Sequence, residues 1–276
     1  MLASTDLAAI AEQMKSAQRA GHQIPPFSAR YAGFDMESAY AVADELHRAR
    51  LRAGQVSVGR KLGFTNPAMW PLFNVDAPVW AHVYESTVVQ LGQPGHGRQT
   101  CSLGSFVEPK IEPEIILHFK EAPPVAADAD AILRCVDWIA HGFEIVQCHF
   151  PGWQFKAPDT VVDLALHATL LVGERVSVDE LGSNPAEQLA QCSIELSCNA
   201  VCQEIGRGFN VLGSPLLALA HLTKVLASQP DSLPIQAGEI VTTGTITKAY
   251  SIQVGEVWTT AVEGIELPGL SIEFTR

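Results

Sequence analysis

Four charged residues alternate with apolar ones in the segment Val107–Ile116. Glu108, Lys110, Glu112 and Glu114 are spaced two positions apart, so in a β-strand their side chains share one face. Two carboxylates at positions i and i+2 can converge on one hard cation such as Mg²⁺, which prefers oxygen ligands. A solvated strand face would show the same alternation, so the pattern by itself leaves both interpretations open.

Two prolines lie on the opposite, apolar side of the same segment. Pro109 and Pro113 have no N–H group to donate to a neighbouring strand. We therefore expect this strand to lie at a sheet edge, or to be bulged, at those points. Edges and bulges are common beside active sites.

Two further charged residues have apolar or glycine-rich neighbours. Glu144 begins an apolar run, and a buried acid is rarely left unpaired. Lys61 lies between Gly59 and Gly63, and burial would lower the pKa of its amine towards the range useful for proton transfer. Taken singly, each is equally compatible with an ordinary surface position.

Other motifs of chemistry are absent or incomplete. The glycines at 206, 208 and 213 do not have the dinucleotide-binding spacing, and Ser214 is not in a nucleophile elbow. His141, His149 and His167 lack the helical spacing of a zinc protease. These patterns favour a carboxylate site over the other three classes.

Helical patterns dominate the first fifty residues and recur twice later. Leu7, Ile10, Ala11 and Met14 form an apolar stripe, and Asp35 is a good N-cap for a second helix that ends near Gly54. Further helices are predicted over 130–141 and from Ser214-Pro215 onward.

From about residue 56 the chain consists mostly of short β-like runs separated by Gly and Pro. The predicted strands are 56–62, 79–89, 111–119, 168–172, 193–196, 239–243 and 270–274. Strands do not alternate regularly with helices, which argues against a doubly wound sheet. We expect an α+β fold with a mixed, mostly antiparallel β core, an N-terminal helical segment over 1–55 and a β-rich catalytic domain over 56–276.

Composition limits the partners. The 276-residue chain has a formal net charge of −12, with 47% hydrophobic and 17% charged residues. It lacks the basic face that nucleic acid requires and the Lys/Arg cluster that binds anionic membranes. We expect no nucleic-acid or membrane partner, and the low charge hints at a homo-oligomer.

Cysteine usage and the N-terminus indicate the compartment. The six cysteines include no pair with two-residue spacing, so free thiols in a reducing cytoplasm are expected. The first residues do not form a signal peptide, and no apolar run approaches the roughly 20 residues of a membrane span. The sequence therefore predicts a soluble, cytoplasmic protein.

An ordered set of motifs extends over residues 35–276. It comprises Gly59-Arg60-Lys61-Leu62-Gly63-Phe64-Thr65, Val75-Asp76-Ala77-Pro78, Ile111-Glu112-Pro113-Glu114-Ile115, Phe143-Glu144-Ile145-Val146, Asp159-Thr160-Val161-Val162-Asp163, Val211-Leu212-Gly213-Ser214-Pro215-Leu216 and 237–247. The set resembles the 2-oxopent-4-enoate hydratase and 4-oxalocrotonate decarboxylase family of the fumarylacetoacetate hydrolase superfamily.

The resemblance implies a divalent cation, Mg²⁺ or Mn²⁺, held by carboxylates at the positions of Glu112, Glu114 and Glu144. It also implies that Lys61 handles protons beside a bound small-molecule 2-oxo acid, with Asp76 as a second catalytic residue. The implied fold is a β-roll or barrel with N-terminal and peripheral helices, often assembled into larger homo-oligomers.

Substrate contacts are implied at Thr245 and Thr247, and His167 is added as a candidate because the preceding segment departs from the family. Where the family has Ala-Asp-Asn-Ala-Ser, this chain has Val162-Asp163-Leu164-Ala165-Leu166. Where the family has Glu-Ile-Val-Asp-Ser-Arg, it has Glu144-Ile145-Val146-Gln147-Cys148-His149. Leucines in place of polar residues suggest a larger or more apolar substrate tail.

These features together predict a metal-dependent lyase acting on small 2-oxo acids or their dienols. The cation would act as a Lewis acid on the 2-oxo acid, and Lys61 would move protons on its carbon skeleton. Water addition, as in the hydratases, is the leading reaction. A 4-oxalocrotonate-type decarboxylase, a carbon–carbon bond hydrolase using His149 or His167, and a non-enzymatic partner subunit of an active paralogue are the alternatives.

Overall fold

Seven α-helices occur in the part of the chain that the structure describes. The structure is a computed structural model that describes all residues except 1, 74, 93–98 and 230–231. The helices are α1 (Ser4–Ala20), α2 (Met36–Arg52), α3 (Trp70–Phe73), α4 (Ala129–Arg134), α5 (Ala157–Val162), α6 (Pro185–Gln191) and α7 (Pro215–Ser228).

The described strands form two sheets. They are β1 (Ser57–Gly63), β2 (Val79–Tyr84), β3 (Val88–Gln90), β4 (Thr100–Ser102), β5 (Lys110–Phe119), β6 (Val136–Val146), β7 (His167–Val172), β8 (Val176–Ser177), β9 (Ser193–Cys198), β10 (Val201–Arg207), β11 (Ile240–Thr242), β12 (Tyr250–Ser251), β13 (Val257–Glu263) and β14 (Ser271–Thr275). The larger sheet has the order β2-β1-β11-β5-β6-β7-β3, with β12 beside β5 and β8 beside β6, and the smaller has the order β10-β9-β13-β14-β4.

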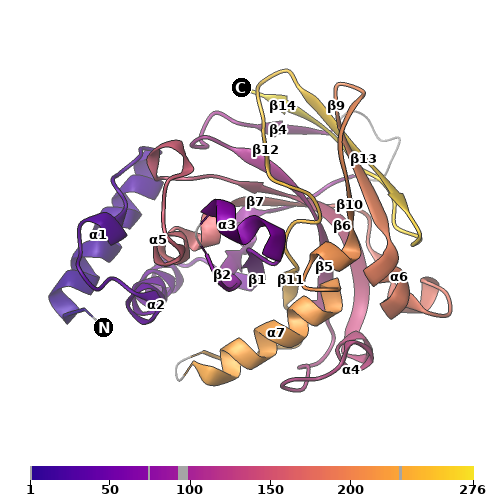
Figure 1. Cartoon of the computed structure of the whole chain (residues 1–276), viewed down its shortest axis with the longest axis horizontal. Helices are drawn as coiled ribbons and strands as arrows, with labels where there is room; N and C mark the ends of the chain where they lie inside the picture. Colours follow the sequence, from indigo (N-terminus) through magenta and orange to yellow (C-terminus); the bar gives the residue numbers. More distant parts are fainter. Residues whose placement is uncertain (1, 74, 93–98, 230–231) are drawn as a thin grey trace.

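Most strand pairs are antiparallel; the exceptions among the described strands are β1–β11, β3–β7 and β14–β4. The larger sheet curls around its own interior, the smaller sheet lies over one end, and α7 crosses below (Figure 1). The predicted α+β class with a mixed, mostly antiparallel β core is confirmed.

The two faces of β5 belong to different cores, because side chains alternate along a strand. Ile115, Leu117 and Phe119 pack into the core that α4, α6 and α7 cover. Ile116 faces the other way, into a small apolar cluster that fills one end of the curled sheet's interior, together with Ala140, Leu170, Val172 and Ile240. Glu112 and Glu114 share the face of Ile116, so they also lie in this interior.

The N-terminal helices form as predicted. Asp35 caps α2 by accepting a hydrogen bond from the backbone N–H of Ser38 at 2.8 Å. Ile10, Ala11 and Met14 of α1 are buried, in a core that also contains residues of α2, β2 and α5. The helices lie at one end of the molecule (Figure 1). The division into units 1–55 and 56–276 stays a prediction.

The helix predicted over 130–141 is wrong beyond its first turns. Helix α4 ends at Arg134, and β6 runs from Val136 to Val146. Ile132, Val136 and Ile139 have helical spacing, but a strand buried on both faces is also a continuous apolar run. Glu144 therefore lies within a strand and does not follow a helix.

The expectation of an edge or bulge at Pro113 is only partly right. Strand β5 is interior, between β6 and the β11 and β12 strands. However, β11 pairs with residues 116–118 and β12 with residues 110–111, so regular pairing is interrupted between them. On the side of β5 that faces β11 and β12, the Pro113 carbonyl accepts a hydrogen bond from Ile246 N–H at 3.0 Å. Because neither strand pairs with Pro113 there, the missing N–H of proline removes no hydrogen bond between strands.

One segment has the length and apolar character of a membrane span, contrary to the sequence expectation. It is Gly208–Ser228, with 21 residues and a mean hydropathy of 1.4, of which 56% is buried inside the protein. Leu216, Leu219, Leu222 and Leu226 of α7 lie in the main core. This burial is typical of the core helix of a soluble protein.

Candidate active site

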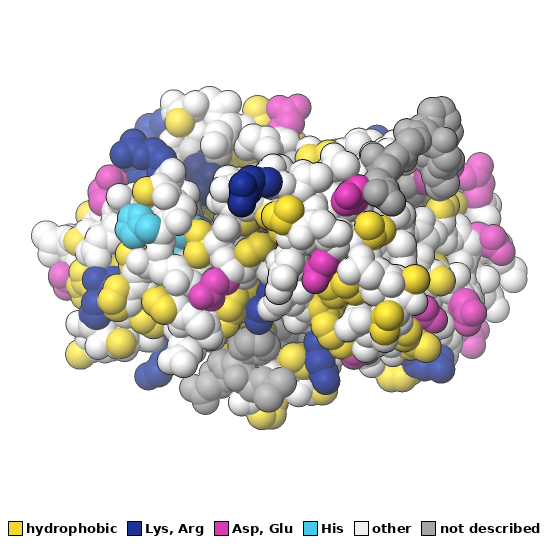
Figure 2. Space-filling view, turned by 90° about the horizontal axis from the view of Figure 1, so that it is seen from above, with side chains coloured by type: hydrophobic (Ala, Val, Ile, Leu, Met, Phe, Trp, Pro, Cys, Tyr) yellow, Lys and Arg dark blue, Asp and Glu magenta, His cyan; other side chains and the backbone are white. Residues whose placement is uncertain are grey.

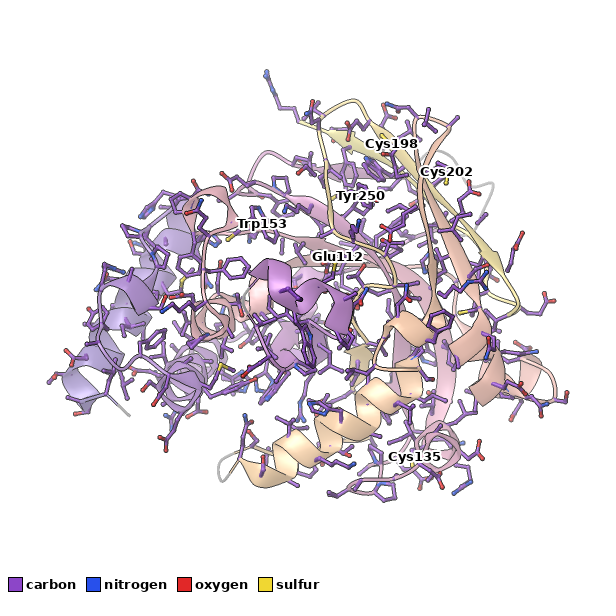
Figure 3. The ribbon with its side chains drawn as sticks, in the orientation of Figure 1. Glu112, Cys135, Trp153, Cys198, Cys202 and Tyr250 are labelled. Carbon is purple, nitrogen blue, oxygen red and sulfur yellow. The ribbon has the colours of Figure 1, made fainter. Side chains whose placement is uncertain are left out.

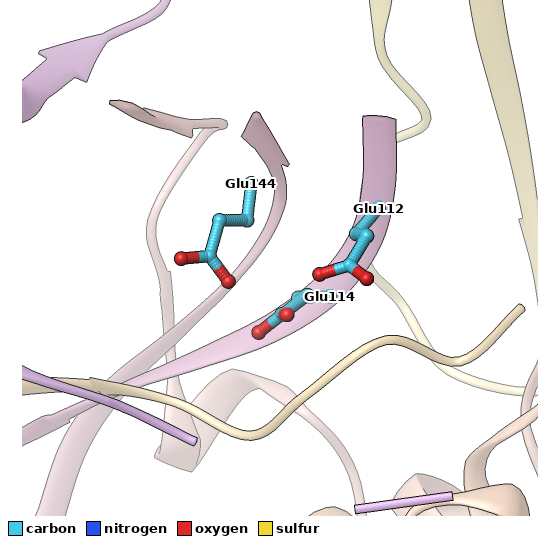
Figure 4. Close-up of side chains that lie close together, drawn as sticks. All are labelled: Glu112, Glu114 and Glu144. Carbon is cyan, nitrogen blue, oxygen red and sulfur yellow. The ribbon is translucent and has the colours of Figure 1, made fainter. Parts of the chain in front are cut away.

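Three carboxylates converge in the interior of the larger sheet. Glu112 and Glu114 lie on β5, and Glu144 lies directly opposite Glu112 on β6. One carboxylate oxygen from each residue lies within 4.8 Å of those of the other two. Figure 4 shows the three carboxylates turned towards a common space between the strands.

The neighbouring pair in the same register makes room for this cluster. Gly142 lies opposite Glu114, and a Cβ atom at this glycine would lie 2.4 Å from Ile116 Cδ1 and 2.8 Å from the Leu171 carbonyl oxygen. Only glycine therefore fits between β5 and β7 here.

Like charges placed opposite each other across a sheet are destabilising, so the cluster requires a compensating charge.

Lys61 supplies one positive charge from β1. Its Nζ lies 3.1 Å from Glu144 Oε2 and donates a hydrogen bond of 2.8 Å to the Ala165 carbonyl oxygen. The Lys61 side chain is 2% exposed. A lysine this deeply buried needs both contacts, because an unpaired ammonium would cost several kcal/mol.

A strained turn presents the Ala165 carbonyl to Lys61. Leu164, Ala165 and Leu166 all have positive φ, at 55°, 50° and 68°. Non-glycine residues in the left-handed region cost about 1–2 kcal/mol each. Such strain concentrates at functional sites, and here it turns a backbone oxygen towards the carboxylate cluster.

His167 holds Glu144 from the side opposite Lys61. Its Nδ1 lies 2.7 Å from Glu144 Oε1, and its Nε2 lies 2.8 Å from Thr87 Oγ1. The histidine is 3% exposed. Because a carboxylate only accepts, Nδ1 donates to Glu144, and the ring fixes the orientation of that carboxylate.

Burial and mutual repulsion set the protonation of the cluster. Burial raises the pKa of Glu112 to about 7, although Lys61 opposes this shift. Burial, with Glu144 and Glu112, holds the pKa of Glu114 well above its usual value. Burial alone would also raise the pKa of Glu144, but Lys61 and His167 bring it below the usual value. Burial tends to lower the pKa of Lys61, but the three carboxylates raise it overall.

The residues fit a divalent cation. Glu114 Oε1 and Glu144 Oε2 are buried without a hydrogen-bond partner among the described residues, and Lys61 contacts the latter only as an ion pair. An oxygen separation of up to 4.8 Å suits one ion with ligands at about 2.0–2.6 Å. Carboxylates without nitrogen or sulfur ligands favour Mg²⁺, Mn²⁺ or Ca²⁺. Binding would release protons from Glu112 and Glu114.

A cavity of about 580 Å³, including its open mouth, lies above this cluster. Glu112 reaches its wall, whereas Glu114 and Glu144 do not line it. Figure 3 shows Glu112 near the centre of the molecule with Trp153 and Tyr250 on either side. The lining residues are Lys61, Leu62, Gly63, Phe64, Thr65, Asn66, Met69, Glu112, Val146, Trp153, Ala165, Leu166, Thr245, Lys248 and Ala249.

The predicted substrate-contacting residues fall in different places. Thr245 lines the cavity, and its hydroxyl donates to the Thr247 carbonyl at 3.0 Å. Thr247 is buried, and its own hydroxyl donates to the Lys248 carbonyl at 2.9 Å. His167 lies behind Glu144 and is not among the lining residues. Its position favours a role in orienting Glu144 over a contact with substrate.

The predicted catalytic Asp76 does not line the cavity to which Lys61 belongs. It is exposed. Of the departures from the family pattern, Leu166 lines the cavity, and Leu164 packs against the core of the N-terminal helices. His149 is buried against Asp163, with Nδ1 2.8 Å from Oδ1.

Sequence reasoning missed the groups that complete the cavity. The Ala165 carbonyl has no sequence signal, because any residue carries one. Trp153, which Lys110 covers with Nζ 3.8 Å from the ring centroid, follows Pro151-Gly152 in a short turn. A turn of Pro and Gly before an aromatic residue was the available clue to it.

Comparison with known proteins gives relatives over nearly the whole chain. 2-Keto-4-pentenoate hydratase 2 of Dechloromonas aromatica (strain RCB) is 30% identical over 262 residues, covering 93% of this chain and 94% of the relative. 4-Oxalocrotonate decarboxylase of Pseudomonas putida is 27% identical over 259 residues, covering 93% of each. No protein-family model matches.

Solved structures have the same fold. The 4-oxalocrotonate decarboxylase of Pseudomonas putida G7, complexed with magnesium and adipate, superposes with a TM-score of 0.88 at 24% identity, covering 99% of both chains. Fumarylpyruvate hydrolase of Pseudomonas aeruginosa, in complex with Mn²⁺ and pyruvate, gives a TM-score of 0.58 at 12% identity, covering 78% of this chain and 88% of the other. The chain belongs to the 2-keto-4-pentenoate hydratase family.

Proposed function

We propose that this protein is a divalent-cation-dependent lyase that adds water to a small 2-oxo acid or its dienol. The observation that carries the proposal is the buried cluster of Glu112, Glu114 and Glu144 beneath a cavity, with Lys61 beside it. Relatives named as hydratases at up to 30% identity support the reaction class.

Glu112, Glu114 and Glu144 would hold the cation, Mg²⁺ or Mn²⁺. When bound, the cation supplies Lewis-acid stabilisation of the negative charge that develops on the 2-oxo group. His167 fixes Glu144 through the 2.7 Å contact. The related decarboxylase is solved with magnesium and with calcium, which supports a hard divalent ion.

Lys61 would transfer the proton. Its amine lies at the cavity wall and is held by Glu144 and the Ala165 carbonyl, so its Nζ faces the end of the cavity where the carboxylates lie. A 2-oxo acid there would present its carbon skeleton to this amine. Thr245, which also lines the cavity, would contact the substrate, whereas Asp76 does not line the cavity.

A decarboxylase is the second candidate, because a relative with that name is 27% identical. Both reactions use the same electron-accepting headgroup, and the carboxylates and Lys61 serve either. Carbon–carbon bond hydrolysis has less support, since neither His149 nor His167 lines the cavity. A non-enzymatic partner subunit would need none of the four charged groups that this chain retains.

The distal part of the cavity favours an apolar substrate tail. Phe64, Met69, Val146, Trp153 and Leu166 line it, and none of these side chains offers the charge that a second substrate carboxylate requires. Among the described residues that line the cavity, the basic ones are Lys61 and Lys248. We therefore propose that longer or bulkier dienoates are better substrates than 2-hydroxypenta-2,4-dienoate.

The test is turnover of the metal-loaded protein on a panel of 2-oxo acids and dienols, with CO₂ release and water addition followed separately. Water addition without CO₂, fastest for substrates with an apolar tail, is the expected result. CO₂ release would replace the hydratase assignment by the decarboxylase. Equal or faster turnover of the unsubstituted dienoate would remove the apolar-tail proposal.

Compartment and assembly are further proposals. All six cysteines are free, and Cys198 and Cys202 of the smaller sheet lie far from Cys135 near α4 (Figure 3), which supports a reducing cytoplasm. On the face shown in Figure 2, basic side chains gather towards the end with the N-terminal helices and acidic ones towards the other end. Light scattering would test the proposed homo-oligomer.

A further inference from the structure

Thr65 has an unusual buried hydroxyl next to the carboxylate cluster. Thr65 is the second residue after the end of β1 and is 1% exposed. The residue before it, Phe64, has a φ of 55°. Its carbonyl oxygen accepts a hydrogen bond from Leu212 N–H at 2.9 Å. The backbone on both sides is therefore fixed, and the side chain has little freedom to turn away.

The Thr65 hydroxyl makes no hydrogen bond within the described part of the chain. An unpaired buried hydroxyl destabilises the folded state. Valine would fill the same volume without that penalty. Because Thr65 also lines the cavity, a bound ligand that accepts a hydrogen bond from its hydroxyl would account for the threonine.

Gly244 places this hydroxyl beside Glu114. A Cβ atom on Gly244 would lie 1.8 Å from Thr65 Oγ1, and the φ of +94° also favours glycine here. The Gly244 N–H donates to Glu114 Oε2 at 2.9 Å. Thr65 thus packs against the residue that binds a carboxylate of the cluster.

Thr65 also lines the cavity, together with Lys61, Glu112 and Thr245. Glu112 and Lys61 belong to the carboxylate cluster, and Thr65 is next to it through Gly244. Met69, Trp153 and Leu166 are apolar lining residues of the same cavity. An acceptor for the Thr65 hydroxyl would therefore belong to the charged headgroup of the substrate and not to its tail.

We propose that Thr65 is a substrate-binding residue whose hydroxyl donates a hydrogen bond to a carboxylate oxygen of the 2-oxo acid headgroup. This inference rests on the proposed function. It assigns Thr65 a recognition role in addition to Lys61 and Thr245. It also explains Gly244, since any side chain there would displace the Thr65 hydroxyl.

Thr242 offers a matched control. It is fully buried on β11, and its hydroxyl also has no hydrogen-bond partner among the described residues. It does not line the cavity. Thr242→Val also removes a buried, unpaired hydroxyl, but from a residue that does not line the cavity, so it separates the loss of a buried hydroxyl from the loss of a ligand contact.

The experiment is calorimetric titration of oxalate, which mimics the headgroup, into the Mn²⁺-saturated full-length protein. Wild type, Thr65→Val, Thr65→Ser and Thr242→Val are compared, with Mn²⁺ affinity and thermal stability measured for each. Thr65→Val should bind oxalate about ten- to a hundredfold more weakly, the value of a hydrogen bond to a charged group. Thr65→Ser should retain most of the affinity, and Thr242→Val all of it, with Mn²⁺ affinity unchanged throughout.

Three results would overturn the inference. These are wild-type oxalate affinity in Thr65→Val, a parallel loss of Mn²⁺ affinity (which would make Thr65 a support for Glu114), or equal weakening in Thr65→Ser.

If wild type turns over 2-oxo acids while Thr65→Val binds oxalate normally, the proposed function stands and the inference fails. If oxalate binding depends on Thr65 but no 2-oxo acid is turned over, the proposed function fails and the contact stands. Absence of oxalate binding by wild type would remove both.

Discussion

The cluster around Asp163 and the cluster of Glu112, Glu114 and Glu144 are both buried, and their hydrogen bonding differs. Asp163 is 2% exposed, and both of its carboxylate oxygens are satisfied. Oδ1 accepts from His149 Nδ1 at 2.8 Å and Gln18 Nε2 at 3.2 Å, and Oδ2 accepts from His149 N–H at 3.0 Å. In the other cluster, Glu114 Oε1 is equally buried and has no hydrogen-bond partner in the described chain, and Glu144 Oε2 has only the ion pair with Lys61 at 3.1 Å.

The difference separates a structural cluster from a binding one. Buried polar groups in folded proteins are nearly always hydrogen-bonded, and the Asp163 cluster follows that rule while connecting α1 to the chain after β6. The Glu112, Glu114 and Glu144 cluster departs from it and places three buried carboxyl groups beside one lysine. Such an arrangement is a candidate functional site on physical grounds, and a cation would satisfy it.

Removing a carboxylate from the unsatisfied cluster gives the largest expected change in activity. Glu114→Gln should lower kcat/KM by about a thousandfold or more, because Lewis-acid stabilisation is worth several kcal/mol. Thermal stability without metal should stay level or rise, since a buried carboxyl group with an unpaired oxygen is replaced by a neutral amide of the same shape. Full activity of Glu114→Gln, or full activity of the wild type in excess chelator, would contradict the assignment.

Lys61 tests whether its position beside the carboxylates serves chemistry. Arg keeps the charge but stays protonated at any working pH, and Met keeps bulk without charge. Lys61→Arg and Lys61→Met should each lower kcat by about 10²–10⁴-fold, the usual contribution of general acid–base catalysis. Mn²⁺ affinity, measured by calorimetry, should hardly change. Near-normal turnover by Lys61→Arg would leave Lys61 without a catalytic role.

Asp163 should show the opposite response. Asp163→Asn replaces one of the two acceptor oxygens by a donating NH2 group, so His149 N–H, His149 Nδ1 and Gln18 Nε2 can no longer all be accepted, and leaving a buried polar group unpaired costs about 1–3 kcal/mol. Urea unfolding should show that loss, while kcat/KM changes only severalfold in the fraction that remains folded. If Asp163→Asn were fully stable but inactive, the distinction between the two clusters would be wrong.

A pair of half-buried histidines should give a smaller, pH-dependent effect. His47 and His82 stack with ring centroids 3.6 Å apart, and burial, with His47 and Arg60, lowers the pKa of His82 to about 3. In the unfolded chain this histidine takes up a proton near pH 6.5, but in the folded protein it stays neutral down to about pH 3. The free energy of unfolding should therefore fall as the pH is lowered from 6.5 towards 3. Urea midpoints from pH 7.5 to 5 should fall less in His82→Gln than in wild type; equal slopes would refute this.

The sequence predicted those parts of the fold whose signals are local. The cap at Asp35, the stripe of α1 and the Ser214-Pro215 start of α7 all depend on neighbouring residues, and all are confirmed. Strand β6 was mistaken for a helix because burial on both faces removes the two-residue alternation. Burial on both faces is decided by tertiary packing, which no local pattern reports.

The site divides in the same way. The shared face of Glu112 and Glu114 followed from alternation in β5, but the place of Glu144 opposite Glu112 depends on strand register. Only the family resemblance indicated it. A left-handed turn at Leu164–Leu166 places His167 behind Glu144 and the Ala165 carbonyl beside Lys61. The Leu-Ala-Leu sequence does not signal such a turn.

The most direct test of the central claim is calorimetric titration of Mn²⁺ into the metal-free protein, comparing wild type with Glu144→Gln and Asp163→Asn. The unsatisfied cluster predicts one ion per chain for wild type and for Asp163→Asn, with proton release on binding, and no binding to Glu144→Gln. Undiminished binding by Glu144→Gln, or its loss in folded Asp163→Asn instead, would contradict the account.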